Sequence, residues 1–267
     1  MLLSVLIASF YFAWDMLEQR EIISSSTVKD GGWQRQQGEY RMAVKLFVLG
    51  LPGSGKSGVA RYIQMYARDK DWKATHFNDY AILKKMFHND TKKQFKPACH
   101  GGFDVIDFTV IDTALQELEQ QVNQYLSSAK QQEIVLIEFA RNDYLRAFQL
   151  FSDTLLQDAY FLYLDAEIKI CKQRICERIE DPIYDDDYYV SEHIFETYYH
   201  EDDGKDLPDF LEREHQIGKQ RVRIIDNNCS LKAASQKIDQ FIDIIIDSES
   251  ACASMPVQAE KLLVGMQ

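Results

Sequence analysis

Residues 50–57 read Gly50-Leu51-Pro52-Gly53-Ser54-Gly55-Lys56-Ser57, and the segments on either side of them decide the fold. An apolar run from Val44 to Leu49 precedes them and predicts a strand that is buried on both faces. After Ser57 the apolar residues recur at helical spacing, which predicts a helix. Strand, glycine-rich turn and helix in this order allow the N–H groups of the turn to converge on one point.

These residues fit the pattern G-x-x-x-x-G-K-[ST] at every fixed position, which predicts a phosphate-binding loop. Glycines let the backbone curl around a phosphate, and the helix N-terminus adds a partial positive charge. We expect Lys56 to reach the β- and γ-phosphates of a nucleoside triphosphate and the Ser57 hydroxyl to bind Mg²⁺. The residues expected to bind the nucleotide here are Gly50, Pro52, Gly53, Ser54, Gly55, Lys56, Ser57 and Gly58.

Five short β-like runs alternate with helical stretches along the 267 residues. This alternation predicts an α/β fold, in which a mostly parallel sheet carries helices on both faces. We expect a long helical segment between the second and third runs and a closing helix from Leu231 to Ile246. Ligands of such sheets bind beyond the carboxyl ends of the strands. The predicted strands are Val44–Leu49, Ala74–Phe77, Ile134–Phe139, Tyr160–Leu164 and Val222–Ile225.

Charged residues follow the second and third predicted strands. Asp79 is placed to orient the hydroxyl group of a phosphoryl acceptor as a general base, and capping of the next helix is the open alternative. Glu138 stands where a carboxylate usually holds Mg²⁺ or its waters, and an ion pair with Arg141 is its alternative. Arg141 is itself placed to bind a phosphate or an acidic acceptor.

Asp165, after the fourth strand, is expected to begin a helix that carries Arg174 and Arg178 on one face. Beside a triphosphate, these two guanidinium groups would stabilise the charge that develops during phosphoryl transfer, and a solvated basic face is the alternative. Asn227, after the fifth strand, either frames a nucleobase or makes the turn.

The net charge of −12 is concentrated in one segment. Residues 180–214 contain 14 acidic side chains against only Lys205 and Arg213, so the remainder of the chain is close to neutral. This balance disfavours a nucleic-acid partner. Because like charges repel, we expect the segment to pack loosely and to respond to a ligand.

One domain is expected, over residues 42–247, between an N-terminal extension (1–41) and a C-terminal tail (248–267). The apolar run Leu2 to Trp14 is too short to span a bilayer and lacks the features of a secretory signal. Met42 directly precedes the first strand, so we expect residues 1–41 to be a non-native upstream extension, with a membrane- or partner-binding helix as the alternative. Five scattered cysteines without a C-x-x-C pair indicate reduced thiols in a cytoplasmic protein.

From Met42 to about Ile246 the sequence resembles the P-loop kinases of the adenylate-kinase and nucleoside-monophosphate-kinase type. The resemblance rests on the phosphate-binding loop, on Asp79, and on Glu138-Phe139-Ala140-Arg141. Further matches are Tyr163-Leu164-Asp165-Ala166 leading into the two arginines, and Ile225-Asp226-Asn227-Asn228.

This resemblance implies the three-layer P-loop NTPase fold, with ATP and Mg²⁺ as cofactors and a small-molecule acceptor bound by residues 80–130. It also implies a mobile lid at about 179–216. The residues it implies for catalysis are Lys56, Asp79, Arg141, Arg174 and Arg178, with Ser57 and Glu138 on the metal and Asn227 beside the nucleotide.

Two departures from the adenylate kinases bear on the acceptor. The segment after the third strand lacks the Gly and Pro of their D-G-[FY]-P-R sequence, and the lid is acidic where theirs carries arginines. These departures favour an acceptor other than a nucleoside monophosphate. A regulatory NTPase switch is the alternative function, and a polynucleotide 5′-kinase is disfavoured by the charge. A pure switch has no need of Asp79 facing an acceptor region, which favours the kinase.

Overall fold

The computed structural model describes residues 43–129, 132–184, 187–229 and 231–253, all of which belong to one unit of the chain, 41–267. The predicted extension at 1–41 and residues 254–267 of the predicted tail lie outside the described residues.

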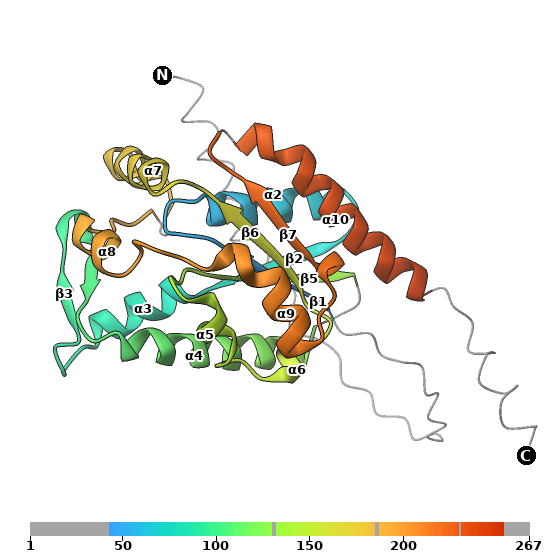
Figure 1. The fold of residues 1–267 in the computed structure, drawn as a ribbon, viewed down its shortest axis with the longest axis horizontal. Helices are drawn as coiled ribbons and strands as arrows, with labels where there is room; N and C mark the ends of the chain where they lie inside the picture. The colour runs from blue at the N-terminus through green and yellow to red at the C-terminus, as the bar shows by residue number, and fades with distance from the viewer. Residues whose placement is uncertain (1–42, 130–131, 185–186, 230, 254–267) are drawn as a thin grey trace, which may run out of the picture. The chain divides into compact units, whose positions relative to one another are not determined.

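A parallel sheet with the strand order β2-β5-β1-β6-β7 forms the centre of this unit (Figure 1). β1 is central because all of its residues are apolar or have a buried side chain, so it can pair with β5 on one side and β6 on the other. Each strand coincides with one of the predicted apolar runs, so the predicted parallel sheet is confirmed. The strands are β1 (Val44–Leu49), β2 (Lys73–Asn78), β5 (Glu133–Phe139), β6 (Tyr160–Asp165) and β7 (Val222–Asp226).

Helices cover both faces of the sheet, which confirms the predicted three-layer α/β architecture (Figure 1). One face packs against α2 (Lys56–Arg68) and α10 (Leu231–Ala253). The other face packs against α4 (Thr109–Leu126), α5 (Tyr144–Phe148), α6 (Asp153–Leu156) and α9 (Leu207–His215).

The segment between β2 and β5 differs from the single helical segment predicted for it. A small antiparallel hairpin separates α3 (Asp79–His88) from α4. Its strands, β3 (Phe95–Pro97) and β4 (Phe103–Val105), have 3 residues each, too few to show a strand period in the sequence. The remaining elements are η2 (Cys99–Gly101), α7 (Ile168–Glu180), α8 (Glu192–Thr197), η3 (Gly204–Asp206) and η4 (Lys219–Arg221).

The acidic segment packs more closely than its charge predicts. One stripe of α9 is buried in the main core and consists of Leu207, Phe210 and Leu211. The carboxylate of Asp203 accepts hydrogen bonds from the backbone N–H groups of Tyr144 (2.6 Å) and Leu145 (3.1 Å), at the first turn of α5. Loose packing was therefore a wrong expectation for this part of the segment, because some of its carboxylates serve as internal hydrogen-bond acceptors.

Two element boundaries also differ from the prediction. Asp165 does not begin a helix, because it is the last residue of β6 and α7 begins at Ile168. The closing helix α10 continues past Ile246 to Ala253, so the predicted tail begins inside it.

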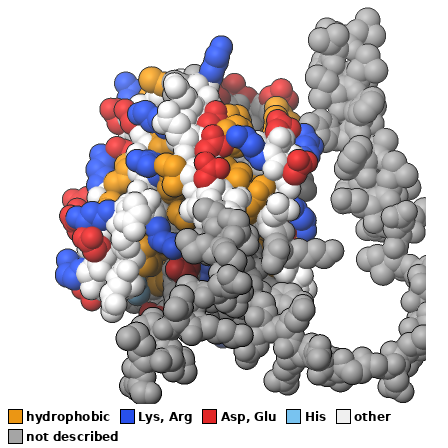
Figure 2. Space-filling model, turned by 90° about the vertical axis from the view of Figure 1, so that its right-hand side faces the viewer, with side chains coloured by type: hydrophobic (Ala, Val, Ile, Leu, Met, Phe, Trp, Pro, Cys, Tyr) orange, Lys and Arg blue, Asp and Glu red, His pale blue; other side chains and the backbone are white. Residues whose placement is uncertain are grey.

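Among the described residues, no helix combines the length and the apolar character that crossing a membrane requires. On the coloured part of the surface in Figure 2, Lys and Arg side chains are interspersed with Asp and Glu side chains.

The centre of the core is Phe47 on β1, which is fully buried and stacks on Phe161 with ring centroids 5.1 Å apart. We expect Phe47→Ala to lower the free energy of unfolding by about 3–5 kcal/mol, because the surrounding rings cannot fill the cavity it leaves. Urea denaturation followed by circular dichroism measures this change. Met65→Ala is the control: Met65 is 55% exposed on α2, so its replacement should change stability by less than about 0.5 kcal/mol. Equal effects of the two substitutions would contradict the placement of Phe47.

Candidate functional site

The loop of residues 50–57 connects β1 to α2, and other parts of the chain hold its backbone. The N–H of Gly50 donates to the Tyr144 hydroxyl at 2.8 Å. The carbonyl oxygen of Ser54 accepts a hydrogen bond from Asn227 Nδ2 at 2.7 Å. Tyr144 and Asn227 are both buried, so hydrogen bonds from the interior of the protein fix the start and the middle of the loop.

Close packing also explains two of the glycines. Gly53 and Gly55 have φ values of 80° and 100°, in the left-handed region that favours glycine. A Cβ atom at Gly53 would lie 2.4 Å from the carbonyl oxygen of Cys171, and one at Gly55 would lie 2.7 Å from Asn227 Nδ2. The loop therefore follows a path that only glycine can take at these two positions.

A cavity of about 190 Å³, here called the loop cavity, lies in front of this loop. It brings together most of the residues that the sequence predicted for nucleotide, metal and charge stabilisation. Its lining comprises Gly53, Gly55, Lys56, Ser57, Gly58, Arg61, Glu138, Arg174, Arg178, Asp187 and Tyr188.

Lys56, in the first turn of α2, is the buried cation of the loop cavity. Its ammonium group donates to the carbonyl oxygen of Leu51 at 3.0 Å. Burial lowers the pKa of Lys56, and the negative charges of Glu138 and Asp79 oppose that shift. The two carboxylates offset part of the cost of burying the ammonium group, which has further N–H donors to offer an anion.

Glu138 is held between the loop and β2. Its Oε1 accepts a hydrogen bond from the Ser57 hydroxyl at 2.8 Å, and its Oε2 lies 2.8 Å from His76 Nε2. Burial acts to raise the pKa of Glu138, but the His76 hydrogen bond and the Lys56 charge outweigh it, so the pKa is lowered. The carboxylate is thus kept ionised, and the predicted alternative of a Glu138–Arg141 ion pair is wrong.

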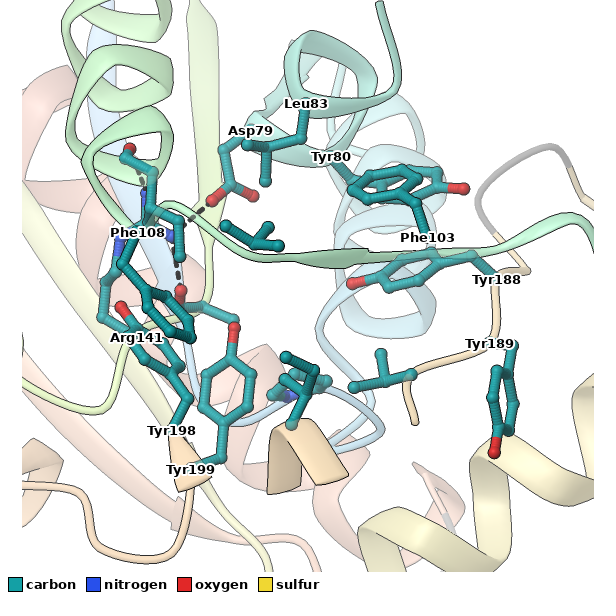
Figure 3. Close-up of a pocket in the computed structure, with 16 residues that line it drawn as sticks. Asp79, Tyr80, Leu83, Phe103, Phe108, Arg141, Tyr188, Tyr189, Tyr198 and Tyr199 are labelled. Carbon is teal, nitrogen blue, oxygen red and sulfur yellow. Dashed lines mark hydrogen bonds and ion pairs between the residues drawn. The ribbon is translucent and has the colours of Figure 1, made fainter. Parts of the chain in front are cut away.

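Arg141 pairs instead with Asp79. Its Nη1 lies 2.6 Å from Asp79 Oδ2, and its Nη2 donates to the carbonyl oxygen of Ile111 at 2.9 Å (Figure 3). Burial raises the pKa of Asp79 above its usual value, although the neighbouring guanidinium opposes the shift. The helix cap is Asn78, whose side chain accepts from the N–H of Ala81 at 2.9 Å, so the interpretation of Asp79 as the cap is wrong.

A second, smaller cavity of about 70 Å³ lies beside this pair, and we call it the aromatic pocket (Figure 3). Tyr188 lines both this pocket and the loop cavity, so the two cavities adjoin. Pro52, which the sequence predicted for the nucleotide, faces this pocket. The rings that line the pocket are those of Tyr80, Phe103, Phe108, Tyr188, Tyr189, Tyr198 and Tyr199.

Arg174 and Arg178 are half-buried and line the loop cavity, so the alternative of a fully solvated basic face is wrong. Arg174 Nη2 donates to the carbonyl oxygen of Asn227 at 2.8 Å. Arg178 donates through Nε (3.2 Å) and Nη2 (2.7 Å) to the carbonyl oxygen of Tyr188. Both guanidinium groups are therefore anchored at the edge of the cavity.

Besides Pro52, three residues predicted to touch the nucleotide do not line the loop cavity. Gly50 directs its N–H to Tyr144, and neither Ser54 nor Asn227 lines the loop cavity. Asn227 was expected beside a nucleobase, but its amide is bonded to the loop backbone. It supports the loop from behind and is a positioning residue.

Sequence reasoning missed His76, Tyr144 and the aromatic pocket. The sequence contained one indication of His76: it is the only histidine of its strand and stands two positions before Asn78, the polar residue that ends the strand. Tyr144 follows Asp143, the N-cap of α5, and nothing in the sequence sets this tyrosine apart.

The residues present fit a triphosphate and Mg²⁺. The first N–H groups of α2 have no intrahelical acceptors, and Gly55 supplies no side-chain cap. In the part of the chain that the structure describes, no group of three or more His, Cys, Asp or Glu side chains is arranged to hold a metal ion. Ser57 and Glu138 instead offer two oxygen ligands beside the predicted phosphate position, as suits Mg²⁺ held mainly by phosphates and waters.

Comparisons with known proteins give likeness of fold only. No protein-family model and no curated protein matches the sequence. The structure of Kti12 from Chaetomium thermophilum in complex with ADP-AlF3 is similar over 74% of this chain and 97% of that chain, with 13% identity and a TM-score of 0.49. A sugar kinase from a Janibacter species has a TM-score of 0.45 at 12% identity, over 76% of this chain and 95% of that one.

The Mycobacterium tuberculosis APS kinase, in complex with AMPPNP and APS, has a TM-score of 0.44 at 12% identity, over 76% and 98% of the two chains. At this level of similarity an activity has to be inferred from the residues of the site. The finer resemblance to the adenylate kinases stays a prediction.

We expect Mg·ATP to raise the melting temperature of the unaltered protein and Lys56→Ala to abolish this rise. The backbone cradle alone leaves the charge of the β- and γ-phosphates poorly compensated. Differential scanning fluorimetry measures the shift. Lys70→Ala, at an exposed ion pair with Asp243, should keep it. If Lys56→Ala kept the full shift, the loop cavity would not be the nucleotide site.

We expect Asn227→Ala to weaken nucleotide binding by about 10-fold, because the buried Ser54 carbonyl loses a partner whose removal typically costs about 1–3 kcal/mol. Asn228→Ala is the matched control, since Asn228 bonds Asp226 and Glu167 and has no contact with the loop. Calorimetric titration with an ATP analogue compares the two variants. Equal affinity in both would show that the loop keeps its path without Asn227.

Proposed function

We propose that this chain is an ATP-dependent phosphotransferase that acts on a small-molecule acceptor. The observation that carries this proposal is the buried Asp79 carboxylate, which lines the aromatic pocket next to the loop cavity. A protein that only binds or hydrolyses a nucleotide has no need of an acidic group in a second, adjoining pocket. A kinase needs one to receive a proton from its acceptor.

The two buried carboxylates have opposite pKa shifts, which supports two different roles for them. The pKa of Asp79 is raised mainly by burial, whereas that of Glu138 is lowered by its hydrogen bonds and by Lys56. Pairs of acidic groups whose environments separate their pKa values mark acid–base assignments in active sites. Asp79 fits the proton acceptor, and Glu138 fits the permanently ionised group.

In the proposed reaction the hydroxyl oxygen of the acceptor attacks the γ-phosphorus of ATP. The new O–P bond forms as the bond between the γ-phosphorus and the β,γ-bridging oxygen breaks, and the electron pair of that bond stays on ADP. Asp79 takes the hydroxyl proton. Arg141 acts as a positioning residue for Asp79, because its guanidinium is bonded to that carboxylate and to backbone carbonyls.

Lys56, Arg174 and Arg178 would stabilise the negative charge that develops on the phosphates. Ser57 and Glu138 are the residues that would hold Mg²⁺, which supplies charge neutralisation at the phosphates when bound. His76 would fix the orientation of Glu138 through its 2.8 Å contact.

The lid that the sequence predicted at 179–216 is proposed in a narrower form. α9 packs in the core, which argues against movement of the C-terminal part of the predicted lid. Residues 187–199 contribute Tyr188 to both cavities and Tyr198 to the aromatic pocket, and they are the part that would exclude water around bound substrates. The cytoplasmic location expected from the cysteines stays a prediction.

The proposal is tested by ADP release in the presence of a panel of alcohols. Acceptor-dependent release supports a kinase. ADP release at the same rate whether or not an alcohol is present supports the regulatory NTPase. A 5′-hydroxyl oligonucleotide in the panel tests the polynucleotide kinase.

We expect Asp79→Asn to keep its affinity for ATP and to lower turnover by about 10²- to 10⁴-fold, the usual contribution of a positioned base. Asp112→Asn, which alters a more exposed ion pair with Arg146, is the control and should keep turnover. Steady-state kinetics and thermal melts are measured in parallel. A loss of stability without any catalytic defect in the folded fraction would show that Asp79 is structural.

The pH dependence should follow from the raised pKa of Asp79. The ionised carboxylate is the form that accepts a proton, so kcat/KM for the acceptor should fall as the pH drops through the Asp79 pKa. Because that pKa is above the ordinary aspartate value of 3.8, the fall should begin at a higher pH than for an unperturbed aspartate. In Asp79→Asn this limb of the profile should disappear, and its persistence would assign the limb to another group.

A further inference from the structure

Residues 202–204, here called the acidic anchor, read Asp-Asp-Gly, and all three contact the interior of the protein. Asp202 accepts hydrogen bonds from the Tyr163 hydroxyl on β6 and, at 3.0 Å, from the N–H of Gly204. Gly204 is buried with its backbone against the ring of Tyr163, and a Cβ atom at this position would collide with that ring. The ring of Tyr163 is therefore held at its hydroxyl and along its edge.

The acidic anchor also holds Tyr144, the first residue of α5. The half-buried Asp203 carboxylate accepts the backbone N–H groups of Tyr144 at 2.6 Å and Leu145 at 3.1 Å. The ring of Tyr163 packs edge to face on the ring of Tyr144, with centroids 5.8 Å apart and an interplanar angle of 85°. Both the backbone and the ring of Tyr144 thus depend on contacts with residues 202–204 or with the ring that they fix.

The hydroxyl of Tyr144 is the contact that reaches the phosphate-binding loop. Tyr144 is fully buried, and its hydroxyl oxygen accepts the N–H of Gly50, the first residue of the loop, at 2.8 Å. Burial raises the pKa of Tyr144, and the backbone N–H groups of Gly50 and Arg141 oppose that shift. Because an unpaired buried N–H is costly, the loop has to begin where this oxygen is.

We propose that Asp202, Asp203 and Gly204 are positioning residues for nucleotide binding. They fix Tyr144, and the hydroxyl of Tyr144 fixes the start of the phosphate-binding loop. The inference rests on the proposed function, because it concerns the nucleotide site of the same reaction. None of these four residues lines the loop cavity, so their effect on a nucleotide has to pass through the loop.

Calorimetric titration of the full chain with Mg²⁺ and the β,γ-imido analogue of ATP measures this effect without turnover. We expect Tyr144→Phe and Asp203→Ala each to weaken binding about 10-fold, because in both variants the buried Gly50 N–H loses a fixed acceptor. The double variant should also lose about 10-fold, and not the roughly 100-fold of two independent sites, since residues of one hydrogen-bond network are not additive. Asp203→Asn keeps one acceptor oxygen and should recover most of the affinity.

Two control variants separate positioning from a general loss of stability. Tyr160→Phe removes the hydroxyl of another buried tyrosine, which bonds Ser248 at 2.9 Å and stands at the opposite end of β6 from the loop. Glu201→Ala removes the same charge as Asp203→Ala from an exposed position two residues earlier. Both controls should keep the affinity of the unaltered protein. If Asp203→Ala does not fold, Asp202→Ala takes its place in the double variant, with the same expected non-additivity.

Hydrogen exchange of the protein without nucleotide separates this inference from the proposed function. We expect Asp203→Ala to speed the exchange of the amides of residues 50–57 by about 10-fold, and Tyr160→Phe to leave it unchanged. If the unaltered protein does not bind the ATP analogue, the proposed function fails, and the exchange rates alone decide the positioning role. Unchanged exchange in Asp203→Ala would overturn the inference. So would unchanged affinity in that variant or additive losses in the double variant.

Discussion

A loop that turns its N–H groups toward a ligand must satisfy its carbonyl oxygens on the other side, and this constraint organises the site. The Ser54 carbonyl accepts from Asn227, and the Leu51 carbonyl accepts from Lys56 and from the N–H of Ser54. Asn227 comes from the end of β7, so the edge of the sheet and its centre are joined at this point. Such bonds leave the N–H groups of the following helix turn available to an anion.

A second constraint is the burial of charge. Lys56, Asp79, Glu138 and Arg141 are all buried, and each has a partner of opposite charge or a hydrogen-bond partner. Burial of an unpaired charge would be costly, so these side chains hold one another in place. These polar groups come from β5, from the turn that follows it, from α2 and from α3, so their contacts join four parts of the chain.

The fold could be predicted largely from the sequence because short stretches of neighbouring residues specify most of its elements. Each strand is a short apolar run, and residues 50–57 fix the first crossover. The hairpin β3–β4 could not be predicted, since its strands are too short to show a period. The packing of α9 was not predicted, because acidic residues such as Asp203 dominate the composition of this segment. The spacing of its apolar residues Leu207, Phe210 and Leu211 is nevertheless helical.

The candidate site was predictable residue by residue but not pair by pair. Asp79, Glu138 and Arg141 were each identified from their positions at strand ends. Their pairing depends on how the strands lie in register, which places Asn78 opposite Glu138 and turns Asp79 toward Arg141. The aromatic pocket draws on residues from α3, β4 and the acidic segment, and no spacing in the sequence connects these parts.

The contact between Arg178 and Tyr188 joins the two cavities physically, so a ligand in one of them is expected to change the affinity of the other. Arg178 lines the loop cavity, its guanidinium is bonded to the carbonyl of Tyr188, and the ring of Tyr188 lies on Tyr80. A ligand that draws this guanidinium away must break the bonds that hold the tyrosine. Coupling of this kind is reciprocal: the factor by which one ligand changes the affinity for the other is the same in both directions. In the proposed reaction, the order in which the two ligands bind would therefore alter the path to the ternary complex and leave its total free energy of formation unchanged.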